Sequence, residues 1–154
     1  MKGGISLLSI KVSTVTPLSD MRLLVTFENG VAKIFDVRAI ATSFPEYAAL
    51  ENPDLFALVQ VEPGGYGVAW TPELDASEGE LWENGVDIPL SQEDLTRFAA
   101  ANIVSTGEAC EMLSCSRQNI DDLVRRKKLR PVRALPREKL FLRCDIAARR
   151  AQGS

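Results

Sequence analysis

The stretch that decides the fold of the C-terminal third reads Ser105-Thr106-Gly107-Glu108-Ala109-Cys110-Glu111-Met112-Leu113-Ser114-Cys115-Ser116-Arg117-Gln118-Asn119-Ile120. Ser105 stands three residues before Glu108, which is the spacing of a capping box at a helix start. Apolar residues then recur twice at helical spacing: Ala109, Met112 and Leu113, followed by Ile120, Leu123 and Val124. Two short amphipathic helices joined by a turn at Ser114-Cys115 predict a helix-turn-helix.

The second predicted helix begins at Ser116, whose hydroxyl can cap it, and its polar face is suited to DNA. With the apolar residues turned inward, a period of about 3.6 residues places Gln118, Asp122 and Arg125 toward solvent, with Arg117 on a shoulder. Arg and Gln can form two hydrogen bonds with guanine and adenine in the major groove. We therefore expect this helix to bind there.

A basic run from Arg125 to Arg130 and a predicted hairpin follow the second helix. Val132–Ala134 and Lys139–Leu142 are expected to pair around Pro136-Arg137-Glu138, with basic residues at the tip, as a wing against the phosphate backbone. Asp145 is expected to cap a final helix from Ile146 to Gln152. The candidate DNA-binding residues are Ser116, Arg117, Gln118, Arg125, Arg126, Lys128, Arg133, Arg137 and Lys139.

This arrangement resembles the excisionase-like and MerR-like helix-turn-helix domains from Ile103 to about Ile146. The matching residues are Thr106, Glu108-Ala109, Met112-Leu113, Ser116-Arg117, Ile120, Leu123-Val124-Arg125-Arg126, Lys128-Leu129, Arg143 and Asp145. The resemblance implies a recognition role for Arg117, Gln118 and Arg125. It implies a wing role for Arg133, Arg137 and Lys139.

The chain departs from that family's pattern at two places. Glycine is usual in the turn and after the recognition helix, where this chain has Ser114 and Lys127, so Lys127 is expected to adopt a left-handed conformation. Asp121 and Asp122 place carboxylates on a helix that should face phosphates. We expect these carboxylates to pair with Arg125 and Arg126 four residues on, which would make affinity modest.

Charge divides the chain into two parts. Residues 1–90 contain 5 basic and 13 acidic residues, a net charge of −8, whereas residues 91–154 contain 13 basic and 8 acidic residues, a net charge of +5. A connecting helix, capped by Ser91, is expected to run to about Ala101, with the domain boundary between Pro89 and Asn102. The prediction is an acidic domain, 1–90, and a DNA-binding domain, 91–154, that includes this helix.

The acidic domain is predicted to contain antiparallel strands and short helices. Residues 10–36 alternate as strands do, and Asn29-Gly30 predicts a hairpin with a type I′ turn. Residues 37–58 predict two short helices broken by Pro45 and Pro53. Further strands are expected at Val59–Val61 and Tyr66–Trp70, before an acidic stretch, 73–83, that should face solvent or a partner. We expect Trp70, Trp82 and Tyr66 to fill the core.

Residues 10–88 resemble the bacterial domain of unknown function 2442. The resembling features are Leu24–Gly30, Phe35-Asp36-Val37, Asn52–Phe56, Trp70, Leu74-Asp75 and Glu80-Leu81-Trp82. Trp82 stands where that family usually has tyrosine. The resemblance implies a small α+β fold and no activity.

Several functional classes are excluded by composition. The chain has no histidine, which excludes His-dependent catalysis and His-ligated metals, and its 3 cysteines make a disulfide framework unexpected. Cys110 and Cys115 are expected to be buried apolar groups and not metal ligands. No membrane span or signal peptide is evident, so we expect a cytoplasmic protein without membrane contact, cofactor, metal or enzymatic activity.

The whole pattern predicts an α+β protein: a small antiparallel-sheet domain with short helices, then an α-helical winged helix-turn-helix domain. Its expected function is transcription regulation through double-stranded DNA, with an N-terminal domain that senses or binds a protein partner. A homodimer that contacts two half-sites is the expected assembly. The alternative is an antitoxin-like or adaptor protein whose two domains serve mainly protein contacts.

Overall fold

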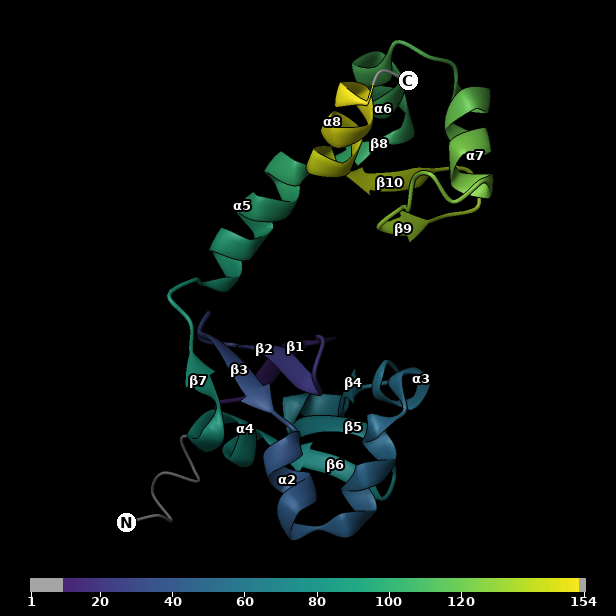
Figure 1. Cartoon of the computed structure of the whole chain (residues 1–154). Coiled ribbons are helices and arrows are strands. Elements are labelled where there is room, and N and C mark those ends of the chain that lie inside the picture. Colours follow the sequence, from purple (N-terminus) through teal and green to yellow (C-terminus); the bar gives the residue numbers. More distant parts are fainter. Residues whose placement is uncertain (1–9, 153–154) are drawn as a thin grey trace. The chain divides into compact units, whose positions relative to one another are not determined.

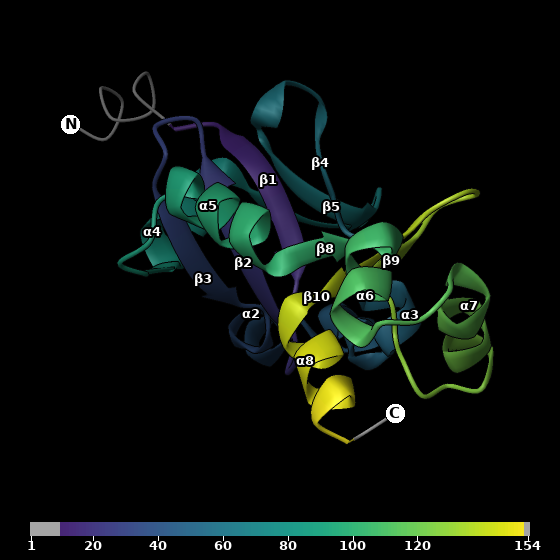
Figure 2. The ribbon, with the colours of Figure 1, turned by 90° about the horizontal axis from the view of Figure 1, so that it is seen from above.

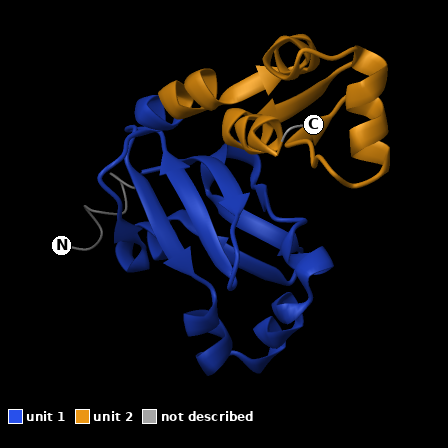
Figure 3. Ribbon diagram, turned by 45° about the horizontal axis from the view of Figure 1, so that its top comes forward, with its two compact units in different colours: residues 1–95 blue, residues 96–154 orange. Residues whose placement is uncertain are grey.

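The computed structural model describes residues 10–152, which form two compact units, 1–95 and 96–154 (Figure 3). Each unit has its own cluster of buried hydrophobic residues. Both units combine antiparallel strands with helices, so the predicted α+β class is confirmed.

Two antiparallel sheets form the first unit (Figure 1). The first has the order β1-β2-β3-β7, and its strands are β1 (Val12–Pro17), β2 (Arg22–Phe27), β3 (Ala32–Asp36) and β7 (Val86–Asp87). The second has the order β4-β5-β6, and its strands are β4 (Gln60–Val61), β5 (Gly67–Thr71) and β6 (Leu74–Ser77). Antiparallel pairing of β2 with β3 confirms the predicted hairpin.

The turn of that hairpin differs from the prediction. Gly30 has a positive φ of 88°, whereas Asn29 does not, and the Phe27 amide donates to the Val31 carbonyl at 2.9 Å. A type I′ turn needs a positive φ at both central residues, so the loop is instead a three-residue connection with glycine in the left-handed position. The prediction of a two-residue type I′ turn is therefore wrong.

Short helical segments lie between the strands of the first unit. Residues 37–58 contain three and not the expected two: α2 (Arg38–Ser43), the 3-10 helix η1 (Pro45–Glu51) and α3 (Pro53–Phe56). Pro45 and Pro53 begin η1 and α3, because the first helical residue needs no amide donor. A second 3-10 segment, η2 (Pro63–Gly65), precedes β5. The acidic stretch forms β6 and α4 (Glu78–Asn84), which the sequence analysis did not predict.

Of the three aromatic residues that were expected in the core of the first unit, two pack there. Trp70 is buried and its indole donates to the Phe56 carbonyl at 3.0 Å, while Trp82 packs against the core. Tyr66 is 54% exposed, so the expectation that it fills the core is wrong. Its ring instead lies near the ammonium of Lys11.

The second unit contains a three-stranded sheet and three helices after the connecting helix α5 (Gln92–Asn102). The sheet has the order β8-β10-β9, with β8 (Ile103–Ser105), β9 (Arg133–Ala134) and β10 (Lys139–Leu142). The helices are α6 (Thr106–Leu113), α7 (Arg117–Arg125) and α8 (Arg143–Ala151). Figure 2 shows α6 between α7 and α8, and the buried residues that join these elements are Val104, Ala109, Ile120, Leu129, Phe141 and Ile146.

Two local features of this unit differ from the sequence analysis. Strand β8 was not predicted, and it pairs with β10 in the register Val104 with Phe141. Helix α8 begins at Arg143 after the backbone cap Leu142, so Asp145 lies in its first turn and does not cap it. An acidic residue there still interacts favourably with the helix dipole.

Candidate nucleic-acid interface

Helices α6 and α7 are joined by a tight turn built from capping interactions. Ser105 and Glu108 form the predicted capping box, with each side chain accepting from the other residue's amide at 3.1 Å and 2.9 Å. Ser114 ends α6 with a φ of 53°, and the Cys115 amide then donates to the Cys110 carbonyl at 3.0 Å. This is the hydrogen-bond pattern of a Schellman motif, although the left-handed residue is not glycine.

Helix α7, like α6, begins with a side-chain cap and ends with a backbone cap. The Ser116 hydroxyl accepts from the Asn119 amide at 3.2 Å, so this candidate residue caps the helix. At the other end the Lys128 amide donates to the Leu123 carbonyl at 2.8 Å, and Lys127 has the expected left-handed φ, 60°. A second Schellman motif therefore sets where the basic run leaves α7.

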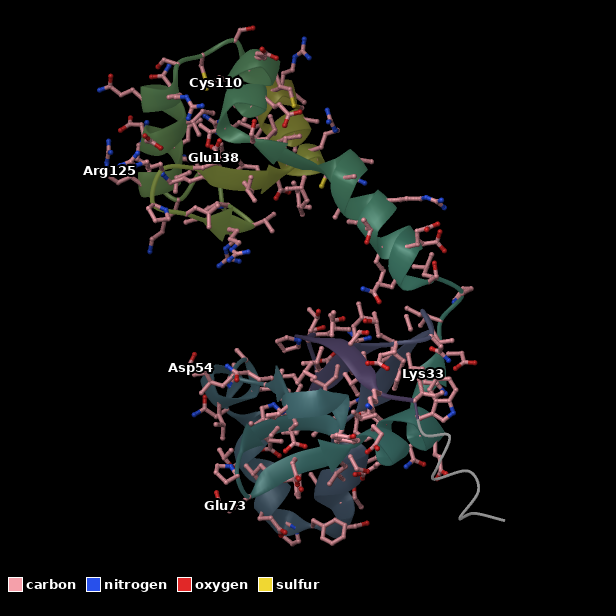
Figure 4. All side chains as sticks on the ribbon, turned by 180° about the vertical axis from the view of Figure 1, so that it is seen from behind. Lys33, Asp54, Glu73, Cys110, Arg125 and Glu138 are labelled. Atoms are coloured by element: carbon pink, nitrogen blue, oxygen red, sulfur yellow. The ribbon has the colours of Figure 1, made fainter. Side chains whose placement is uncertain are left out.

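The polar face of α7 exposes three of the candidate side chains. Ile120 is fully buried, whereas Arg117, Gln118 and Arg125 are exposed (Figure 4 shows Arg125). The side chain of Arg117 lies 4.0 Å from the carboxylate of Glu138, and that of Arg125 is paired with Asp122. All three side chains are therefore open to solvent, and Arg125 is also held in an ion pair with Asp122.

The two carboxylates of α7 have different partners. Asp122 pairs with Arg125 and lies 4.0 Å from Arg126, which agrees with part of the expectation. Asp121 does not pair with Arg125; it accepts from the ammonium of Lys139 in β10 at 3.0 Å. The expected pairing four residues along the helix is wrong for Asp121, because β10 brings a lysine closer.

The β9–β10 hairpin forms as predicted, in the register Ala134 with Lys139 and Arg133 with Leu140. Arg133 and Arg137 are exposed, and Arg137 lies in the connecting turn. Lys139 is not at the tip: it begins β10, its side chain is 29% exposed, and it is paired with Asp121. The expectation that it stands at the tip is therefore wrong.

Glu138 joins the hairpin to the start of α6 through hydrogen bonds. This contact was not predicted from the sequence. One of its carboxylate oxygens accepts from the amides of Thr106 at 3.1 Å and Lys139 at 3.0 Å (Figure 4). A hydrogen bond with the side chain of Thr106 is the largest cause that lowers the pKa of the Glu138 carboxyl, and the amides of Thr106 and Lys139 lower it further. No short-range pattern signals this contact, since Thr106 and Glu138 are 32 residues apart in sequence.

The remaining basic candidates lie on the segments that follow α7 in sequence. Arg126 follows the helix, and Lys128 and the neighbouring Arg130 are exposed on the segment before the hairpin. Leu129 between them is buried, which anchors this segment on the core of the unit. The structure thus places exposed cations on α7, on the basic run and on the hairpin, all within one unit.

The cysteines of the unit are thiols. Cys110 and Cys115 are half-buried against the core, as expected of small apolar residues, and burial is the main cause that raises the pKa of Cys115. Within residues 10–152 there is no group of three Cys, Asp or Glu side chains placed to hold a metal ion. Over the same residues no helix has both the length and the apolar character needed to cross a bilayer.

Comparison with known proteins identifies a family that matches the first unit. The family model described as Protein of unknown function (DUF2442) matches residues 12–89. No curated protein matches the chain. A crystal structure of the protein named putative DNA binding protein NE0471, from Nitrosomonas europaea, is 25% identical, with 83% of this chain and 80% of that chain covered. The TM-score is 0.44.

Proposed function

This chain belongs to the DUF2442 family, whose function is unknown, and we propose that its C-terminal part, residues 91–154, binds double-stranded DNA. In this proposal α6 and α7 act as a helix-turn-helix, α7 lies in the major groove and the β9–β10 hairpin is the wing. The observation that supports it best is the exposure of Gln118 and Arg125 on the face of α7 opposite the buried Ile120, with Arg117 exposed on its shoulder.

The other candidates have positioning and phosphate-binding roles in this proposal. Arg126, Lys128, Arg133 and Arg137 would contact the backbone of the duplex, where charge and not base identity matters. Ser116 fixes the start of α7, and Lys139 fixes the hairpin against that helix through Asp121. We propose a transcription regulator, with the acidic domain, 1–90, as its sensing or interaction part and a homodimer as its DNA-bound form.

A salt titration tests whether this surface contacts phosphates. Contact with about four to six phosphates gives a slope of log K against log salt of roughly −4 to −5 for duplex DNA. The measurement is fluorescence anisotropy with labelled genomic fragments between low and physiological salt. A slope near zero would contradict the proposal, because no counterions would then be released.

An interaction protein of the antitoxin-like or adaptor kind is the second candidate. Val132 and Leu135, which flank β9, are 51% and 37% exposed, and apolar side chains at such positions also suit a protein interface. A rise in apparent mass on mixing with a basic, neighbour-encoded protein, without DNA binding, would favour this candidate. Neither proposal includes enzymatic activity, and turnover that survives deletion of residues 91–154 would contradict both.

A further inference from the structure

A pocket of about 500 Å³ lies within the second unit, lined by the end of α6, one side of α7 and the last turn of α8. Volumes of this size hold small organic molecules. Arg126 comes from the end of α7, and Arg149 and Arg150 come from α8. Sequence reasoning assigned no role to Arg149 or Arg150, because they are far from α7 along the chain.

The pocket is positively charged. Its three arginines face one carboxylate, that of Asp122, which is already paired with Arg125 outside the pocket. Arg126 is 4.0 Å from Asp122, and among residues 10–152 Arg150 has no ion-pair partner. This leaves guanidinium groups whose charge the protein does not neutralise.

Arg149 has a donor that the protein leaves unused. Its Nη1 donates to Gln152 at the long distance of 3.3 Å, and its buried Nε has no acceptor among the described residues. Buried donors in folded proteins are nearly always satisfied. A carboxylate or phosphate binds a guanidinium through two parallel hydrogen bonds, and the guanidinium of Arg149 lies in the wall of the pocket as a partner for such a group.

Part of the remaining lining is apolar, and this part suits the body of an organic molecule. Leu113, Leu123 and the thiol of Cys115 contribute to it, and the raised pKa of Cys115 keeps that thiol neutral. Ser114 and Asn119 add neutral polar groups.

We propose that this pocket binds a small organic anion, with an apolar body against the leucines and a carboxylate or phosphate group against Arg126, Arg149 and Arg150. Because Arg126 is the C-cap of α7, a bound anion also lowers the positive charge beside the proposed recognition face. That second effect rests on the proposed DNA binding, whereas binding of the anion does not.

The experiment uses the full chain and three probes of similar shape: benzoate, phenyl phosphate and the neutral benzamide. Calorimetry gives affinity, and amide resonances report the location of binding. We expect at least one of the two anions to bind and to shift the amides of Cys115, Asn119 and Arg150, with benzamide at least about tenfold weaker. Arg149→Gln should lower anion affinity about tenfold or more. Arg149→Lys should retain part of the wild-type affinity, since lysine keeps the charge but lacks the planar guanidinium that forms two parallel hydrogen bonds. Arg130→Gln, outside the pocket, is the control for general loss of charge.

Three results would overturn the proposal. Equal affinity for benzamide would mean an apolar cavity only, and equal losses in Arg149→Gln and Arg130→Gln would mean unspecific charge attraction. If neither anion binds while duplex DNA shifts the same amides, the arginines are phosphate contacts. Unchanged thermal unfolding of the variants excludes misfolding as the cause. DNA affinity of the wild-type chain is measured separately, so failure of DNA binding is distinguishable from failure of the pocket.

Discussion

The ammonium of Lys139 donates to the Asp121 carboxylate at 3.0 Å and so joins β10 to α7. From the sequence, Lys139 was expected to contact phosphate, and the negative charge of Asp121 was expected to weaken binding to phosphate. In the folded unit the two charges compensate each other, and the pair sets the position of the hairpin beside the proposed recognition helix.

Asp121→Asn should tighten binding to random duplex DNA. The change removes a negative charge and frees Lys139, which should make the salt slope steeper by about 1. The free energy of unfolding should fall by less than about 1 kcal/mol, because the pair is exposed on the carboxylate side. Anisotropy titrations and urea unfolding measure the two effects. Glu111→Gln, an exposed charge change on α6, is the control, and an equal gain there would contradict a specific role for the pair.

Alanine at Arg117, Gln118 or Arg125 should weaken binding to the preferred sequence by about 1–3 kcal/mol and affect random DNA much less. Arg137→Ala, in the hairpin turn, should weaken all duplexes alike and reduce the salt slope by about 1. Competition titrations with preferred and scrambled duplexes separate the two patterns. If the α7 variants and the Arg137 variant gave the same uniform loss, α7 would not lie in the major groove.

Lys127→Gly should stabilise the second unit. Lys127 has a φ of 60°, and relief of this left-handed strain outweighs the greater chain entropy of glycine by about 0.5–1 kcal/mol. Urea unfolding of the full chain, followed by a probe in the second unit, measures the change. Lys127→Ala removes the same charge without relieving the strain, so a similar gain with alanine would assign the effect to charge.

Glu138→Gln should remove part of the acid sensitivity of the unit. The folded-state pKa of Glu138 is lowered, so its contribution to stability is complete above the unfolded value, about 4.3, and is lost as pH falls through the folded value. The difference in unfolding free energy between wild type and variant should therefore shrink as pH falls below about 4. A difference that stays constant from neutral pH to pH 3 would contradict this linkage.

Residues 1–90 and 91–154, made separately, should each unfold cooperatively, because each retains its own buried cluster. Division before Ser91 also keeps the cap of α5, in which the Ser91 hydroxyl accepts from Asp94. Only 91–154 should bind DNA. Circular dichroism during heating and anisotropy test these statements, and DNA binding confined to 1–90 would contradict the assignment.

Much of the fold could be predicted because it depends on residues close together in sequence. The capping box of Ser105 and Glu108, the left-handed Lys127 and the β2–β3 hairpin each depend on fewer than about a dozen neighbouring residues, and all are present. The type of the Asn29-Gly30 turn was wrong, since the register of the flanking strands selected a three-residue loop. Strand β6 and helix α4 were missed because acidic residues hid the alternation at Leu74 and Ala76.

The sequence by itself determined helices α6 and α7, their N-terminal caps and the exposed arginines of α7, since periodicity and capping act over one or two turns. Only the tertiary structure decided the partners of the charged groups: Asp121 with Lys139, Glu138 with Thr106, and Arg149 beside Arg126. These partners are brought together by closure of the hairpin and of α8 onto the core. Such contacts depend on packing between distant segments, which local spacing does not encode.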